Sequence, residues 1–376
     1  MIGGYHAFAA GSISTEYYDI DAVKLLAVIA PVSWVTFHDW RDVALHLLYG
    51  SADGDVTGKP GSVFSQPFRY VDRAPNFRQS TYIHGADHND FNCCGMDNFE
   101  GPAETEIGRE EAQRVAKAVY LALLKHYLEG NVPAKDYLWR QWERFRPIGV
   151  AESTTVVNIY TESPETGKFI IDDYQAESAL HTSSSGGAVS FDVENLLEAF
   201  LYDGDGDFEW TPSDPMNGMT YGLEEGDDPT RGAIFDWPAG SSRFIEFAIV
   251  PEARDVTAYV YLSFRACQGT RHPETTAELG DLTFTVTLRD GSGTTSSINI
   301  SAYGGGIEEP YQRTGAGDGA GWQNEFETIR IRLTDFLHND SGLDLTDIVA
   351  LRFEFGDSFG SSRGRLGLDD VELTTD

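Results

Sequence analysis

Residues 44–56 read ALHLLYGSADGDV, and residues 81–92 read TYIHGADHNDFN. Each stretch begins as a short, nearly continuous apolar run and ends in a turn that contains Gly, Asp or His. Such runs are typical of strands buried on both faces, as in a parallel sheet. A carboxylate after one strand and a histidine after the next would both lie at the carboxyl ends of the strands, where α/β folds gather their site residues.

The rest of the first 150 residues agrees with this interpretation. Residues 24–30 (KLLAVIA) form a third apolar run, and residues 107–130 have the pattern of an amphipathic helix. That helix opens with acidic residues, carries apolar residues at helical spacing and closes on Gly130. We therefore expect residues 1–150 to form an α/β domain.

From about residue 151 the pattern changes to period two. Apolar residues alternate with polar or aromatic ones in five segments, at residues 243–250, 258–265, 282–288, 328–333 and 350–355. Repeated alternating strands without helices between them are typical of a β-sandwich or jelly roll. Residues 151–376 are therefore predicted to form a separate all-β domain.

The charge of the chain excludes some partners. It carries 60 acidic and 27 basic residues, a net charge of −33, and 21 of the 27 bases are arginine. Such a chain would repel nucleic acid and anionic membranes. Because salt screens self-repulsion on an acidic, lysine-poor surface, we infer a high-salt environment. No apolar run of eighteen residues exists, so no membrane span is expected.

Three motifs occur in order along the first domain: a G-x-x-D turn at residues 50–53, the segment YVDRA at residues 70–74, and a G-x-x-H loop at residues 85–88. Together they resemble the α/β-hydrolases, and within them the polyester-hydrolase and cutinase-like esterases. In this family the triad residues follow the order nucleophile, acid, histidine. The resemblance covers roughly residues 1–150 and implies an ester substrate, no catalytic cofactor, and a secreted or cell-surface protein.

Carried over residue by residue, the resemblance makes Asp53 the acid and His88 the base of a Ser–Asp–His triad. Asp55 is the alternative acid, and His84 is a weaker candidate for the base. Zinc binding by the histidines together with Cys93 and Cys94 is disfavoured, because adjacent cysteines would strain a tetrahedral site.

The chain departs from the family at the nucleophile. A G-x-S-x-G elbow is absent from residues 1–150, and Met1-Ile2-Gly3-Gly4 is the one match there to the family's G-H-S-x-G-G turn, with Met1 at the position of Ser. A thioether cannot be deprotonated to attack an ester. The amino-terminal strands of the family are also missing, so residues 24–30 are expected at the edge of a partial sheet. We interpret the chain as a truncated hydrolase that is inactive as given; the alternative is a hydrolase-derived domain that has lost its catalytic half.

The predicted β domain is framed by FIIDDY at residues 169–174 and LDDVEL at residues 368–373. These segments resemble carbohydrate-binding-module jelly rolls, whose first and last strands often pair. The resemblance implies a structural Ca²⁺, which prefers several hard oxygen ligands. The candidate ligands are Asp172, Asp173, Asp369 and Asp370.

Alternation also predicts a polar strip on one sheet face of this domain. Its aromatic and arginine side chains suit a carbohydrate or another hydroxylated ligand, through stacking and forked hydrogen bonds. They are Tyr259, Tyr261, Arg265, Arg330, Arg332 and Arg352. The alternative is an ordinary solvated face. A non-catalytic carbohydrate-binding or surface protein is accordingly the second functional hypothesis.

Overall fold

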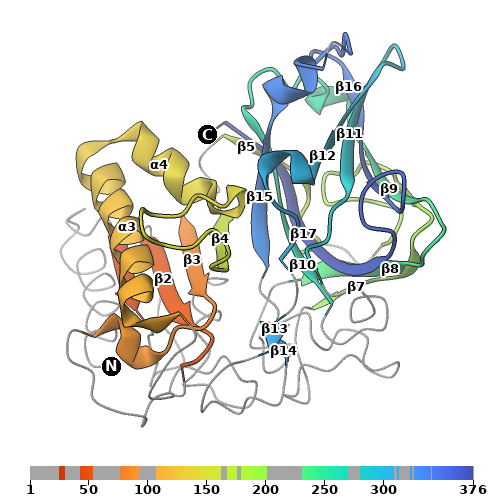
Figure 1. The fold of residues 1–376 in the computed structure, drawn as a ribbon. Helices are drawn as coiled ribbons and strands as arrows, with labels where there is room; N and C mark the ends of the chain where they lie inside the picture. Colours follow the sequence, from red (N-terminus) through yellow and green to blue (C-terminus); the bar gives the residue numbers. More distant parts are fainter. Residues whose placement is uncertain are drawn as a thin grey trace.

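The helices and strands stack in four layers (Figure 1). A helical layer covers one side of a mostly parallel sheet, and the other side of that sheet packs on a sandwich of two antiparallel sheets. The computed structural model describes residues 25–29, 43–53, 77–92, 107–161, 167–175, 179–200, 231–269, 280–308, 311–312, 322–323, 326–339 and 341–375.

The first sheet has the strand order β1 (Leu25–Ile29), β2 (Ala44–Gly50), β3 (Arg78–Ile83) and β4 (Val156–Thr161). The first three strands are parallel, and β4 runs antiparallel to β3. The predicted parallel pairing of the apolar runs is therefore confirmed, with β1 at the edge of the described sheet. The strand β3 starts three residues earlier than its apolar run, because polar residues at its beginning are also buried.

Helix α3 (Gly108–Glu129) spans the predicted amphipathic segment and ends at Gly130, whose φ of 65° is left-handed. It is followed by α4 (Val132–Trp139) and the 3-10 helix η2 (Gln141–Glu143). The buried stripe of α3, which includes Val115, Val119 and Leu123, packs against Leu48 of β2. Apolar residues at three- and four-residue spacing thus cover one face of the sheet.

A buried polar network joins this helical layer to the sheet. The Nε2 atom of His46 lies 3.1 Å from Oγ1 of Thr81, which donates to Oδ1 of Asn158. Both Gln79 and Asn158 donate to the carbonyl of Leu138 in α4, at 3.1 and 3.2 Å. Burial lowers the pKa of His46 to about 3, so its ring is neutral and structural.

The sheet of the sandwich that lies nearer to the α/β layer is called here the near sheet. Its strands are β15 (Glu327–Arg332), β10 (Tyr261–Gln268), β17 (Gly364–Thr374), β8 (Arg231–Trp237) and β7 (Glu194–Phe200), in that order, and β5 (Lys168–Asp172) pairs with β17. The first and last strands of the sandwich therefore pair, as the resemblance implied.

The second sheet of the sandwich, the far sheet, has the strand order β12 (Thr295–Asn299), β11 (Thr285–Asp290), β16 (Ile348–Phe355), β9 (Arg243–Ala248) and β6 (Val189–Phe191). Successive strands pass repeatedly from one sheet to the other, as in a jelly roll. The short elements are β13 (Tyr311–Gln312), β14 (Trp322–Gln323), η3 (Pro251–Ala253), η4 (Ile300–Tyr303) and η5 (Leu333–Leu337).

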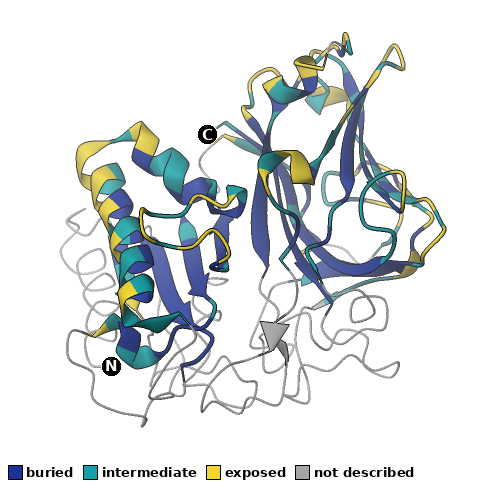
Figure 2. Cartoon of the chain, viewed as in Figure 1, coloured by how far each residue is buried: buried dark blue, intermediate teal, exposed yellow. Residues whose placement is uncertain are grey.

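The predicted apolar faces meet in the core of the sandwich. Buried side chains include Leu262, Phe264, Ile329, Ile331 and Phe353, and Figure 2 shows buried residues along both sheets. Val260, in the alternating segment at residues 258–265, is 44% exposed because it precedes β10 instead of belonging to it. The predicted all-β architecture is confirmed.

The change of sheet lies later than the expected boundary at residue 150. Strand β4 belongs to the first sheet, and its outer edge is capped by Thr328 of β15. The Thr328 hydroxyl accepts from the Tyr160 N–H at 2.9 Å and donates to the Tyr160 carbonyl at 3.1 Å. These bonds satisfy an edge strand that would otherwise expose its backbone.

Candidate functional site

Asp53 and His88 lie at the same edge of the first sheet. Asp53 is three residues beyond the end of β2, and His88 is five residues beyond β3, where it begins the 3-10 helix η1 (His88–Phe91). Because Gly50 and Ile83 are register partners on parallel strands, the two turns emerge side by side. The predicted placement of an acid and a histidine at neighbouring carboxyl ends is confirmed.

The two side chains are in direct contact. Nδ1 of His88 lies 3.0 Å from Oδ2 of Asp53. The Asp53 side chain is fully buried, and the His88 side chain is 14% exposed. Because a carboxylate can only accept, Nδ1 is the donor, and Nε2 of the neutral ring is a proton acceptor. The arrangement can therefore orient an imidazole for general-base chemistry.

Backbone contacts hold the two turns together. The Ser51 N–H donates to the Ile83 carbonyl at 3.2 Å, and the Ala52 N–H donates to the Ala86 carbonyl at 2.8 Å. A Cβ atom at Gly50 would lie 2.3 Å from the Ala86 carbonyl oxygen. The close approach of the turns thus requires glycine at position 50.

A reciprocal cap fixes the helix that begins with His88. Asp87 Oδ1 accepts from the Asp90 N–H at 2.7 Å, and Asp90 Oδ2 accepts from the Asp87 N–H at 3.1 Å. Gln113 of α3 donates to the carbonyls of Asp90 and Asn92. Burial raises the pKa of Asp87. The D-x-x-D spacing of residues 87–90 is the sequence signal of this capping box.

Other candidates for this site have different surroundings. His84 is half-buried, and its Nδ1 lies 3.4 Å from the Tyr82 hydroxyl. Asp55, the YVDRA segment at residues 70–74, the paired cysteines at 93–94 and the MIGG turn at residues 1–4 lie outside the described residues. The roles of these residues stay predictions.

The four acids predicted to bind calcium form two groups on the adjoining strands β5 and β17. Asp172 and Asp173 both accept from the Ser184 hydroxyl, at 2.9 and 2.6 Å. Asp369 and Asp370 are paired with the buried Arg265. Among the described residues no cluster of three or more metal-ligating side chains occurs. The calcium role stays a prediction.

The six residues of the predicted ligand strip do not share one face. Arg352 is on the far sheet, whereas Tyr261, Arg265, Arg330 and Arg332 are on the near sheet and Tyr259 precedes it. The expectation of one strip was wrong, because alternation does not indicate to which sheet a strand belongs.

The near-sheet members of that strip face the α/β layer. The Arg330 guanidinium lies over Trp139, Tyr160 and Tyr261, at 4.3, 5.1 and 4.3 Å from their ring centres. Arg332 lies 3.6 Å from Asp136 of α4. Arg265 and Arg330 are each 1% exposed. Arg330 therefore joins the layers, and neither arginine is presented to solvent as the ligand hypothesis required.

The outer face of the far sheet carries a polar network that solvent reaches. Arg352 contacts Glu246 at 3.3 Å and Glu354 at 3.2 Å, and its guanidinium lies 3.6 Å from the ring centre of Phe244. Thr287 donates to Glu354 at 2.6 Å. The Arg352 side chain is 32% exposed. This face combines a flat stacked surface with ordered hydrogen-bonding groups.

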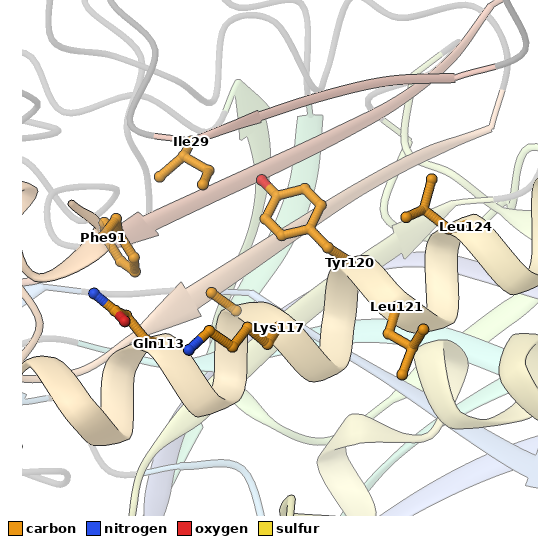
Figure 3. A pocket seen from close by; sticks show the side chains of 8 residues that line it. Ile29, Phe91, Gln113, Lys117, Tyr120, Leu121 and Leu124 are labelled. Carbon is orange, nitrogen blue, oxygen red and sulfur yellow. The ribbon is translucent and has the colours of Figure 1, made fainter. Parts of the chain in front are cut away.

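An apolar hollow of about 470 Å³ lies between α3 and the edge strand β1 (Figure 3). It is lined by Ile29, Phe91, Gln113, Ala116, Lys117, Tyr120, Leu121 and Leu124. Leu121 and Leu124 are each more than half exposed. The hollow therefore lies at the β1 edge of the described sheet.

No model of a known protein family matches the chain, and no curated protein matches it by sequence. Its sandwich is similar to the family 11 carbohydrate-binding module of the cellulase Lic26A-Cel5E of Clostridium thermocellum. That match has 12% identity and a TM-score of 0.30, and it covers 56% of this chain and 96% of the module.

Two further solved structures are similar at the same level. The family 30 carbohydrate-binding module of the Clostridium thermocellum cellulase Cel9D-Cel44B has 13% identity, a TM-score of 0.29, and coverage of 48% of this chain and 98% of the module. The β-1,2-glucanase of Parabacteroides distasonis has 13% identity, a TM-score of 0.29, and coverage of 56% and 25%. Among the described helices, none is long and apolar enough to cross a membrane.

Proposed function

We propose that the edge bearing Asp53 and His88 supplies the acid and the general base of a carboxylic ester hydrolase. The observation that carries the proposal is the 3.0 Å hydrogen bond between Nδ1 of His88 and the buried carboxylate of Asp53. In such a pair the acid holds the imidazole in one tautomer and stabilises the imidazolium that forms during reaction. Direct solvation of Asp53 is prevented by its burial.

The proposed chemistry uses the second ring nitrogen of His88. Nε2 of His88 would take the proton of a serine hydroxyl while the serine oxygen bonds to the ester carbonyl carbon. The imidazolium would then give that proton to the departing alkoxide as the C–O bond breaks, leaving an acyl-enzyme that water hydrolyses by the same steps. We assign the acid and the base of the triad to Asp53 and His88, and we name no residue of this chain as the serine.

The test compares this chain with any longer in-frame product of the same gene that carries a serine elbow. The longer product should hydrolyse 4-nitrophenyl acetate, and His88→Ala should lower its kcat by about 10³-fold or more. Asp53→Asn should also lower kcat strongly. His84→Ala is the matched control and should change kcat little. Turnover by residues 1–376 that survives His88→Ala would refute the assignment.

A second function is favoured by a separate observation. We propose that the outer face of the far sheet binds a carbohydrate or another hydroxylated polymer around Arg352. The Arg352 fork is ordered between Glu246 and Glu354 and stacked on Phe244. Preordered groups lose little freedom on binding, and planar forks suit paired hydroxyls. Such a role would fit a protein that acts outside the cell.

Binding would be measured by calorimetry with a panel of soluble β-glucans. Arg352→Ala should weaken binding at least tenfold, while the matched control Arg332→Ala, on the covered near sheet, should leave it unchanged. His88→Ala should also leave it unchanged, which separates this function from hydrolysis. Equal affinities for the wild type and Arg352→Ala would exclude the site.

A further inference from the structure

Ser51 occupies a special position between the two turns that carry Asp53 and His88. It follows the last residue of β2 and is 6% exposed. Its Oγ accepts from the Gly85 N–H at 2.7 Å. Gly85 belongs to the turn after β3 and has a φ of 78°, in the left-handed region. A side chain from one turn thus holds the backbone of the other.

This bond lies close to the acid–base pair along both segments of chain. Asp53 is two residues from Ser51, and His88 is three residues from Gly85. Each intervening segment therefore spans at most about 7 to 10 Å even when fully extended. The Ser51–Gly85 bond is therefore separated from each member of the acid–base pair by a single short segment of chain.

The neighbouring bonds between the turns involve backbone atoms alone. They join Ser51 to Ile83 and Ala52 to Ala86. The bond to the Ser51 hydroxyl is different because a substitution can remove it without altering the backbone donors. A buried N–H that loses its acceptor is costly, so the Gly85 turn would shift to find another partner.

We infer that Ser51 is a positioning residue that sets the distance between Asp53 and His88. The inference rests on the proposed role of that pair. It assigns no contact between Ser51 and substrate: the Ser51 hydroxyl acts by fixing the Gly85 turn, from which the chain leads directly into the helix that begins with His88.

The test uses the full chain with ¹⁵N-labelled histidine. NMR would report which ring nitrogen of His88 carries the proton and how fast the Nδ1 proton exchanges with water, with His88→Ala used to assign the signal. Ser51→Ala should accelerate that exchange about five- to tenfold, the change expected from losing one buried hydrogen bond. Ser51→Cys, which keeps a weaker acceptor of similar size, should be intermediate.

Ser80→Ala is the matched control. Ser80 is a buried serine of the adjacent strand β3, 1% exposed, and its hydroxyl makes no hydrogen bond. This substitution should leave the His88 exchange rate unchanged even if the protein becomes less stable. A wild-type exchange rate in Ser51→Ala or Ser51→Cys would overturn the inference, whereas a wild-type His88 protonated at Nε2 would instead overturn the proposed acid–base pair.

Discussion

Strands of the two sandwich sheets have a similar alternation of apolar and polar residues, but the outer faces of the two sheets have different surroundings. On the near sheet, Arg330 alternates with buried isoleucines and is enclosed by rings of the α/β layer. On the far sheet, Arg352 alternates with Leu351 and Phe353 and remains 32% exposed, on a face that solvent reaches. Alternation is equally clear in both strands.

The comparison shows what period-two patterning can and cannot indicate. It separates residues that point into the sandwich core from those that point outward. Whether the outward face meets solvent or another layer depends on segments elsewhere in the chain. For the near sheet, β4 and the residues around Trp139 provide the cover.

The largest expected difference concerns the two arginines. Arg330→Ala should lower the free energy of unfolding by about 3 kcal/mol, because it removes a desolvated cation stacked on aromatic rings and leaves a cavity. Arg352→Ala should cost less than about 1 kcal/mol, since its ion pairs are partly solvated. Urea denaturation at constant salt measures both. Equal losses would contradict the distinction between a covered and an open face.

The hydroxyls of Thr328 on the near sheet and Thr287 on the far sheet allow a second comparison, with a smaller expected change in the free energy of unfolding. Thr328→Val should cost about 2 kcal/mol, because it removes two hydrogen bonds to the Tyr160 backbone and leaves a buried edge group without its partner. Thr287→Val, on the far sheet, should cost less than half as much. The two variants are matched in shape and would be compared by denaturant unfolding; a neutral Thr328→Val would mean that the layers are held together mainly by other contacts.

The free energy of unfolding should also depend on pH through Glu308. Burial, aided by Asp281, raises the pKa of Glu308 from 4.5 to about 7. The folded chain then holds a proton that the unfolded chain has released, so the free energy of unfolding should fall as pH rises from about 4.5 to 7. Glu308→Gln should remove about 1–2 kcal/mol of this dependence. Melting curves across this range would test it, and an unaltered profile in Glu308→Gln would exclude Glu308 as the source.

The smallest expected effect is that of calcium. If Asp172 and Asp173 hold an ion, a chelator should lower the melting temperature by about 2–4 °C, because a ligand bound to the folded state stabilises it. The effect should be modest because Arg265 already compensates Asp369 and Asp370. Ionic strength must be held constant, since screening also stabilises an acidic chain. An unchanged melting temperature would end the calcium proposal.

Local sequence patterns were sufficient to predict much of the helical layer and of the mostly parallel sheet that it covers. The apolar runs indicated parallel strands, and the helical spacing ending at Gly130 indicated α3. The order of Asp53 and His88 after successive strands also indicated that they would be neighbours. This worked because parallel strands place their carboxyl ends at one edge, so that strand order alone brings the two turns together.

Other features of the site depended on long-range packing. The buried polar start of β3 was missed because Gln79 looks like a surface residue until Asn158, 79 positions away, provides its partner. The Ser51 bond to Gly85 likewise has no local signature, since any serine after a strand could face solvent instead.

By itself, the sequence determined which residues share a strand, a helix face or a strand end, because these follow from periodicities of two and 3.6 residues. The tertiary structure alone decided what covers each face. Thr328 and Tyr160 are 168 residues apart, yet the hydrogen bond between them joins the near sheet to the α/β layer. Arg330 is an interior residue and Arg352 a surface residue because burial depends on which distant segment packs against a sheet face. Alternation within a strand carries no information about that segment.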